Sequence, residues 1–213
     1  MTEKIKKAVV RRELLIGVLV ALLIGGAWTI MASFDESSYQ TPEVITYSTP
    51  NPEEKKPDES YVWKGDAKSP KKIVYENLGI NAFIQNVGKD QNSEVAVPNN
   101  IHMAGWYVDS TPIGQNGLSV IDGHVDGWTE KGIFTSLKNT AIGDVIDIYL
   151  GDGEKVSYKV FEMNNVDAKE AVNYLFSQSP TVSSQLNLIT CGGKFDTETN
   201  EYEKRIIVFA EKI

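Results

Sequence analysis

The stretch Leu186-Asn187-Leu188-Ile189-Thr190-Cys191-Gly192-Gly193 joins a short apolar run, predicted to be a strand, to the single cysteine of this 213-residue chain. Two glycines follow the cysteine, and their lack of side chains lets neighbouring groups approach the sulfur closely. His124 lies in a similar position, directly after another predicted strand and next to Gly123. Arg205 opens the last predicted strand. These positions predict that a thiol, an imidazole and a guanidinium meet at one edge of a sheet.

Most of the chain after residue 70 alternates with a period of two, which is typical of strands. The tripeptide Gly151-Asp152-Gly153 is typical of a hairpin turn. Two short helices are expected, at Thr129 to Lys138 and at Ala168 to Gln178, the second with Asp167 and Glu170 at capping-box spacing. The sequence therefore predicts a mainly β fold, a closed or nearly closed antiparallel barrel with one or two short helices. The predicted strands are Lys72 to Glu76, Ile80 to Val87, Leu118 to Asp122, Asp144 to Leu150, Lys155 to Met163, Leu186 to Thr190 and Arg205 to Ala210.

The N-terminal region predicts a membrane anchor. Leu14 to Ala32 contains no charged residue, and as a helix it would reach roughly 28 Å, close to the thickness of a bilayer core. Basic residues dominate the 13 residues before it, and the positive flank of a spanning helix stays in the cytoplasm. We therefore expect a cytoplasmic tail at 1–13, an anchor at 14–32 and an external remainder. A cleaved signal peptide ending at Ala32 is the alternative, but its apolar core is usually shorter.

The domain organisation follows from composition. Residues 33–70 are rich in proline and polar residues and predict an extracellular stalk without a core of its own. Residues 71–213 are long enough for one globular domain, and we expect a fragment starting near Lys71 to fold without the stalk. The chain is acidic, with a formal net charge of −8, which argues against nucleic acid as a partner. No segment has the spacing of a calcium loop, so no metal or other cofactor is expected.

Each candidate residue also has a structural interpretation. A lone cysteine is more often a buried, inert thiol than a nucleophile, and a lone histidine is usually held by a backbone partner. Arg205 alone would be a surface charge, and Asp122 and Asp126 could simply solvate the loop around His124. The catalytic interpretation is favoured only because the thiol, the imidazole and the guanidinium occur together.

The pattern resembles the sortases, membrane-anchored cysteine transpeptidases of mainly Gram-positive bacteria. The resemblance spans residues 71–213 and implies an eight-stranded barrel, and its motifs look most like those of classes E and F. Two departures are Asn187, where Thr is usual, and the lack of an Asp-Pro-aromatic lid motif in residues 34–70. The matching segments are Ala104-Gly105-Trp106-Tyr107, Gly123-His124-Val125-Asp126, Leu188 to Gly193 and Arg205 to Ala210.

The resemblance also implies a reaction. Cys191 would cleave a C-terminal sorting motif similar to Leu-Pro-x-Thr-Gly in a surface protein, forming a thioacyl-enzyme, and pass the acyl group to an amine such as a cell-wall precursor. His124 would transfer protons, Arg205 would stabilise the oxyanion, and hydrolysis by water would make the enzyme a thiol protease. The implied location is the cell membrane, as a single-pass protein with an external catalytic domain.

Two alternatives remain open at this point. A non-catalytic, membrane-tethered β-barrel that binds a surface ligand would keep Cys191 as a buried thiol. A transpeptidase of peptidoglycan crosslinks is disfavoured because the Ser-x-Gly-Cys arrangement is missing around Cys191. His102, the other histidine, fits no motif and is expected to be structural or at the surface.

Overall fold

The computed structural model of this chain describes residues 42–58 and 60–213. The predicted tail, the predicted anchor and the first part of the predicted stalk lie outside the described residues. Within the described ranges, no helix combines the length and the apolar character needed to cross a bilayer.

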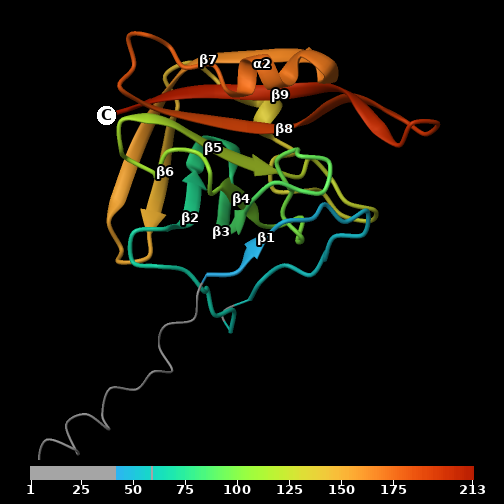
Figure 1. The fold of residues 1–213 in the computed structure, drawn as a ribbon, viewed down its shortest axis with the longest axis horizontal. Coiled ribbons are helices and arrows are strands. Elements are labelled where there is room, and N and C mark those ends of the chain that lie inside the picture. The colour runs from blue at the N-terminus through green and yellow to red at the C-terminus, as the bar shows by residue number, and fades with distance from the viewer. Residues whose placement is uncertain (1–41, 59) are drawn as a thin grey trace, which may run out of the picture. The chain divides into compact units, whose positions relative to one another are not determined.

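The strands close into a barrel. Going round it, the hydrogen-bonded order is β3-β2-β6-β7-β9-β8-β5-β4, and β4 pairs back to β3 (Figure 1). The predicted mainly β, eight-stranded barrel is therefore confirmed. Its strands are β2 (Pro70–Tyr75), β3 (Ile80–Val87), β4 (Ala104–Tyr107), β5 (Gly117–Gly123), β6 (Val145–Leu150), β7 (Lys155–Asp167), β8 (Ser184–Asp196) and β9 (Glu201–Lys212).

An antiparallel barrel was predicted from the sequence, but two of its strand pairs are parallel. Strand β3 pairs in parallel with β4, and β5 pairs in parallel with β8. Parallel neighbours need a long crossover connection. Residues 88–103 supply it between β3 and β4, and the whole segment from β6 to the helix α2 (Ala171–Leu175) supplies it between β5 and β8. Periodicity cannot reveal these pairings, because it reports which face of a strand is buried and not which strand lies beside it.

The expected helix at Thr129 to Lys138 is wrong; only a 3₁₀ turn, η3 (Leu137–Asn139), forms there. The backbone N–H groups of Gly132 and Phe134 bond instead to the carbonyls of Val125 and His124, at 3.1 and 2.9 Å, so they cannot make helical bonds.

The second expected helix forms but is shorter, as the turn η4 (Ala168–Glu170) followed by α2. The predicted capping box is absent: no side chain caps either segment. Asp167 accepts a hydrogen bond from Lys204 of β9 at 2.6 Å instead.

Two apolar clusters stabilise the fold. The first fills the barrel with alternate residues, such as Ile146 and Ile148 of β6 and Leu186 and Leu188 of β8. The second lies on the outer face of the barrel, where α2 covers β9 (Figure 1), and includes Ile207. Strand β8 is buried on both faces because it lies between these clusters, which explains its long apolar run.

Residues 42–70 belong to the same compact unit as the barrel. Strand β1 (Val44–Ile45) pairs with the end of β3, and Ile45 is buried in the outer cluster. The indole N–H of Trp63 donates to the carbonyl of Ile84 at 2.9 Å. Glu53 makes backbone hydrogen bonds to the segment before β4. We call residues 42–63 the N-terminal strap. The sequence did not predict these contacts, because the polar composition of the segment gives no signal for main-chain bonds or for the burial of single side chains such as Ile45.

A fragment of residues 71–213 should be less stable than a fragment of residues 42–213. Removing the strap exposes the surface that Ile45 and Trp63 cover and leaves backbone groups of β3 unpaired, which costs about 3 kcal/mol or more. Thermal denaturation should show a melting temperature lower by roughly 6–12 °C. Within the longer fragment, Trp63→Ala should lower the melting temperature, whereas Val62→Ala, a change at a mainly exposed neighbour, should not. Equal stability of the two fragments would contradict the packing role of the strap.

Candidate active site

Strands β5, β8 and β9 lie side by side and bring the three predicted site residues together. Cys191 of β8 is paired with Arg205 of β9. On the other side, Asp122 of β5 is paired with Ile189 of β8 in a parallel register. Continuing that register by two residues along both strands leads to His124 and Cys191. The imidazole, the thiol and the guanidinium are therefore carried by one row of three neighbouring chain segments.

These side chains line one groove on the outer face of the barrel, with a volume of about 880 Å³. One wall is polar and contains His124, Cys191, Arg205 and Asp122. The connection between β3 and β4 and the helix α2 also contribute to the lining. Apolar side chains from these elements and from the strands reach the groove at Val95, Val97, Tyr107, Val172, Leu175, Phe176 and Ile189. The site thus combines a reactive row with an apolar surface able to hold an extended peptide.

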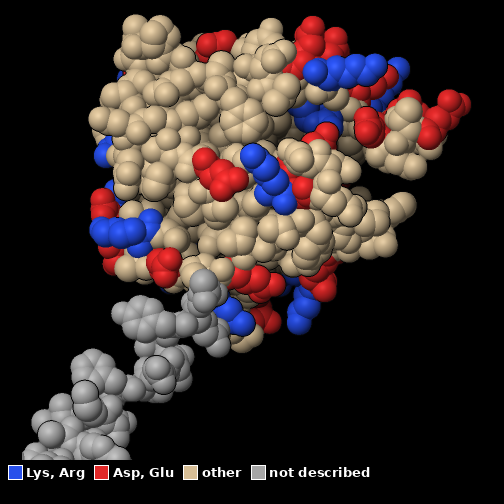
Figure 2. All heavy atoms as spheres, viewed as in Figure 1, with Lys and Arg blue, Asp and Glu red and all other residues tan. Residues whose placement is uncertain are grey.

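Figure 2 shows that charged side chains are sparse on one broad face of the molecule and that acidic ones occur on the projecting hairpin between β8 and β9. The exposed residues of this hairpin include Asp196, Glu198 and Glu201. Both strands continue well beyond the row of His124, Cys191 and Arg205. Cys191 and Arg205 therefore lie inside long strands, although the sequence analysis placed them at strand ends. The hairpin carries negative charge toward the Cys191 end of the groove.

Cys191 is half-buried and unpaired. Burial raises the pKa of its thiol to about 11, an effect opposed by the positive charge of Arg205 and reinforced by Asp122, Asp126 and Glu201. At neutral pH the resting thiol is consequently protonated. Gly193 has a φ of +77°, and a side chain there would collide with Lys204 of β9. The glycine pair thus permits the irregular pairing of β8 and β9 just beyond the thiol.

The ring of His124 is held by one main-chain contact. Its Nε2 lies 2.7 Å from the carbonyl oxygen of Pro98. A carbonyl can only accept, so Nε2 carries the hydrogen and, in the neutral ring, Nδ1 is the atom that can take a proton. The hydroxyl of Thr190 donates to the carbonyl of Gly123 at 2.7 Å. This buried bond ties the chain just before His124 to the chain just before Cys191.

Arg205 keeps its guanidinium at the groove through contacts with its own strand. Nη1 donates to the carbonyls of Tyr202 at 2.9 Å and Lys204 at 3.0 Å. Among the residues that the structure describes, the hydrogen bonds of this side chain involve Nη1 alone. The remaining N–H groups are available to a bound ligand, and a guanidinium keeps its charge throughout the physiological range.

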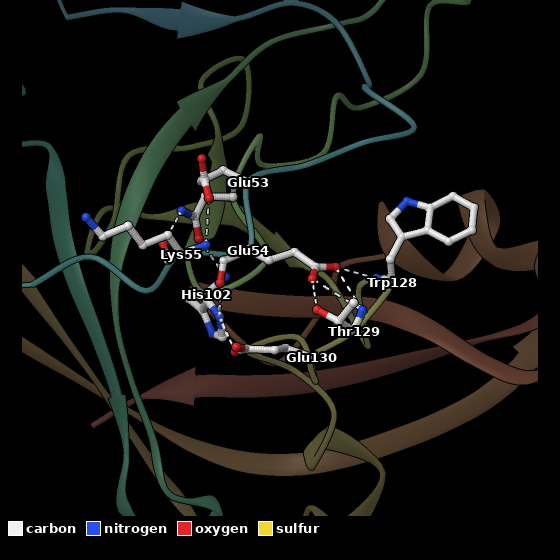
Figure 3. A network of polar contacts seen from close by, with 8 residues as sticks. Glu53, Glu54, Lys55, His102, Trp128, Thr129 and Glu130 are labelled. Carbon is white, nitrogen blue, oxygen red and sulfur yellow. Dashed lines mark hydrogen bonds and ion pairs between the residues drawn. The ribbon is translucent and has the colours of Figure 1, made fainter.

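The loop after His124 is held by the N-terminal strap (Figure 3). The Glu54 carboxylate accepts hydrogen bonds from the backbone N–H groups of Trp128 and Thr129 and from the Thr129 hydroxyl. His102 contacts both the strap and the loop: its Nε2 lies 2.8 Å from the carbonyl oxygen of Glu54 and 3.0 Å from a carboxylate oxygen of Glu130. These contacts give His102 a structural role, and the strap fixes the loop that follows His124.

The helix α2 is held over the groove by buried amides. The side-chain N–H₂ of Asn187 donates to the carbonyl of Leu175, at the end of α2, at 2.7 Å. Gln185 donates to the carbonyl of Ser177 at 2.9 Å and to the side-chain oxygen of Asn187 at 2.8 Å. Carbonyls at the end of a helix have no partner within the helix. Asn187, noted above as a departure from the usual motif, donates the missing hydrogen bond to the carbonyl of Leu175 and so positions α2.

Sequence reasoning missed two members of this site. Pro98, which orients His124, lies in an irregular loop without any pattern. Asp122 could have been noticed as a carboxylate inside an apolar strand, but the sequence analysis treated it with Asp126 as a loop residue. In the structure Asp122 is 9% exposed, whereas Asp126 is exposed and accepts a hydrogen bond from the Tyr202 hydroxyl. Among residues 42–58 and 60–213, no cluster of His, Cys, Asp and Glu is arranged to hold a metal ion.

Comparison with known proteins gives one family. A family model described as a sortase domain matches residues 73–213. A lid mutant of sortase A from Corynebacterium diphtheriae is 23% identical, with a TM-score of 0.52 over 70% of this chain and 73% of that chain. Sortase A from the same organism gives 22% identity and 0.51, over 70% of this chain and 63% of that one. Sortase C1 from Streptococcus agalactiae gives 16% and 0.51, over 70% of each chain. No curated protein matches.

The raised pKa of Cys191 predicts an unusual alkylation profile. An uncharged alkylating reagent attacks the thiolate, so its rate should keep rising with pH beyond 9, the range in which an ordinary thiol is already levelling off. Arg205→Gln removes the positive charge and should slow the reaction further at every pH below 11. Mass spectrometry of the single cysteine measures the rates. A rate that levels off near pH 8.5 in the native protein would contradict the burial of the thiol described above.

Proposed function

Because this chain belongs to the sortase family, we propose that it is a cysteine transpeptidase that uses the row formed by His124, Cys191 and Arg205. The observation that carries the proposal is the register of β5, β8 and β9, which places the three groups on neighbouring segments and in one groove. The alternative function, a non-catalytic binding module, would not require a thiol, an imidazole and a guanidinium side by side in one groove.

The first half-reaction forms a thioester. The Cys191 thiol passes its proton to Nδ1 of His124, and the sulfur attacks a peptide carbonyl carbon. The negative charge that develops on the carbonyl oxygen is stabilised by the N–H groups of Arg205. Collapse of the tetrahedral intermediate breaks the C–N bond, and the imidazolium gives its proton to the departing amine. A thioacyl-enzyme and a neutral His124 result.

The second half-reaction regenerates the thiol. An incoming amine attacks the thioester carbonyl and gives a proton to His124 as the C–S bond breaks. Cys191 leaves as a thiolate, recovers that proton and is ready for another cycle. Water in place of the amine would give hydrolysis. The products are a new amide and the free enzyme, so this chemistry needs no cofactor.

The apolar part of the groove supports a sorting motif similar to Leu-Pro-x-Thr-Gly as the acyl donor. Val95, Val97, Leu175 and Phe176 offer contact area for a leucine and a proline, which have no charge to satisfy. The proposed donors are surface proteins with a C-terminal sorting signal. The proposed acceptor is an amine such as that of a cell-wall precursor. An anchor at residues 14–32 would hold the enzyme in the cell membrane with this domain outside, and the assignment to class E or F stays a prediction.

A transfer assay with a Leu-Pro-x-Thr-Gly peptide and a glycine or lysine-type amine tests the proposal. The native protein should release the C-terminal fragment and form the new amide, and mass spectrometry should detect a thioacyl adduct on Cys191. Cys191→Ala should abolish cleavage and transfer, because no other thiol is present in the chain. Cleavage retained in Cys191→Ala would refute the assignment and favour another nucleophile. If Cys191 reacts with an alkylating reagent but no peptide in a panel of sorting motifs is cleaved, the proposed substrate is wrong.

The two histidines form a matched pair for testing proton transfer. Both rings contact a backbone carbonyl through Nε2, but only His124 lines the groove. His124→Ala should lower kcat by about 10²-fold or more. His102→Ala should lower the melting temperature and leave kcat much less affected than His124→Ala does. Comparable losses of kcat in the two variants would contradict the catalytic role of His124.

Arg205 can be tested against its neighbour. Arg205→Lys should lower kcat strongly, by about 10²-fold, because an ammonium lacks the forked donors that fit an oxyanion. The control Lys204→Arg changes the cation that contacts Asp167 on the adjacent residue, and it should leave kcat within about twofold. Full turnover in Arg205→Lys would contradict the role assigned to the guanidinium.

A further inference from the structure

Asp122 also lines the groove, and the mechanism above gives it no role. Asp122 is 9% exposed, and the two residues before it in the strand, Val120 and Ile121, are fully buried. One carboxylate oxygen accepts the N–H of Gly123 at 2.6 Å. Within the described residues, no lysine or arginine forms an ion pair with this carboxylate. A nearly buried acid that faces a catalytic groove without an ion-pair partner is costly to the fold, which indicates a functional reason for it.

The register fixes what surrounds this carboxylate. On its own strand, His124 lies two residues further on, about 7 Å along the chain. On β8 it is paired with Ile189, so Cys191 is its diagonal neighbour, at about 7–8 Å. Arg205 of β9 lies beyond Cys191, and on β4 the partner of Asp122 is the uncharged Gly105. The loop between β3 and β4 contributes Lys89, Asp90 and Glu94 to the lining of the same groove.

We propose that Asp122 is a positioning residue whose buried negative charge keeps the proton on the Cys191 thiol in the resting enzyme. The proposal rests on the proposed function, since it concerns how the nucleophile of that reaction is controlled. The mechanism is Coulombic: a thiolate beside a carboxylate in a weakly screened site is repelled by it. Arg205 acts in the opposite direction. Asp126 and Glu201 also oppose the thiolate, but both are exposed, whereas Asp122 is nearly buried.

This arrangement makes the reactivity of the thiol conditional. Burial raises the pKa of Asp122 to about 6, against the opposing effects of His124, the Gly123 N–H and Arg205. At neutral pH the carboxylate is charged and the thiol is restrained. Neutralising Asp122, by acid or by excluding water around it when a peptide fills the groove, removes the restraint. Since oxidants attack the thiolate and not the thiol, the same charge protects an unpaired cysteine between turnovers.

The test compares the two aspartates that flank His124 at equal distance in sequence. Asp122→Asn keeps the oxygen that accepts the Gly123 N–H and removes only the charge. Asp126→Asn removes the same charge from an exposed site, where water screens it. Alkylation of Cys191 by iodoacetamide, an uncharged reagent, is followed from pH 5 to 10 by mass spectrometry. Asp122→Asn should react about tenfold faster than the native protein at pH 8, equivalent to a shift of roughly one pH unit.

The pH dependence identifies the cause. Below pH 6 the native carboxyl group is itself protonated, so the rates of native protein and Asp122→Asn should converge there. Asp126→Asn should accelerate the reaction much less than Asp122→Asn does, because water screens the exposed charge of Asp126, which also opposes the thiolate. Equal rates for Asp122→Asn and the native protein at pH 8 would overturn the proposal, and so would an acceleration in Asp126→Asn as large as that in Asp122→Asn.

A second measurement covers the case in which Asp122→Asn does not fold. The variant His124→Ala removes the imidazole from the neighbourhood of the thiol. The logarithm of the alkylation rate, plotted against pH, should still flatten over roughly one pH unit above pH 6, as Asp122 ionises and opposes the thiolate. A straight line of unit slope through that range would overturn the proposal. These measurements need no substrate, so they can succeed or fail independently of the transfer assay that tests the proposed function.

Discussion

The parallel pairing of β5 with β8, beside the antiparallel pairing of β8 with β9, is the constraint on which the site depends. These two registers bring residues 124, 191 and 205 into one row although they are far apart in the sequence. A slip of one residue in either register would turn the affected side chains to the other face of the sheet. The apolar clusters on both sides of β8 prevent such a slip, because it would exchange buried leucines for buried polar groups.

The same burial that fixes the register makes the thiol a weak acid. Cys191 lies on the face that also contributes to the outer cluster, and its environment favours the neutral form. Charges of opposite sign then act on it: Arg205 favours the thiolate, whereas the carboxylates of Asp122, Asp126 and Glu201 oppose it. The balance between them, and not the thiol alone, decides how much thiolate is present. A site of this kind can respond to what fills the groove, because a ligand changes the screening of each charge.

The elements around the row are held by polar side-chain contacts that are separate from the hydrogen-bond ladder of the barrel. Glu54 of the strap secures the loop after His124, and Asn187 and Gln185 secure α2 from below. Pro98 orients the imidazole from a third connection. Each of these bonds joins segments that no local pattern links. These contacts fix the segments that form the walls of the groove. The strap therefore contributes to the structure of the site as well as to the stability of the domain.

The sequence by itself determined the mainly β class, seven of the eight barrel strands, the hairpin at Gly151-Asp152-Gly153 and the candidate residues His124, Cys191 and Arg205. Alternation and turn residues are local signals, and reactive groups beside glycines are rare enough to be noticed. The motif Ala104-Gly105-Trp106-Tyr107 belonged to the family resemblance, but its four residues are all buried and do not alternate, so β4 gave no strand signal.

Only the tertiary structure decided the parallel pairings, the packing of the strap, the loss of the expected helix at Thr129 to Lys138 and the burial of Asp122. In each case the deciding partner lies far along the chain, as with Gly132, whose N–H bonds to Val125 and not to a helical neighbour. A carboxylate in a strand and a carboxylate in a loop look alike in a sequence. What separates Asp122 from Asp126 is the amount of water that reaches each, and that depends on the strands that happen to pack beside them.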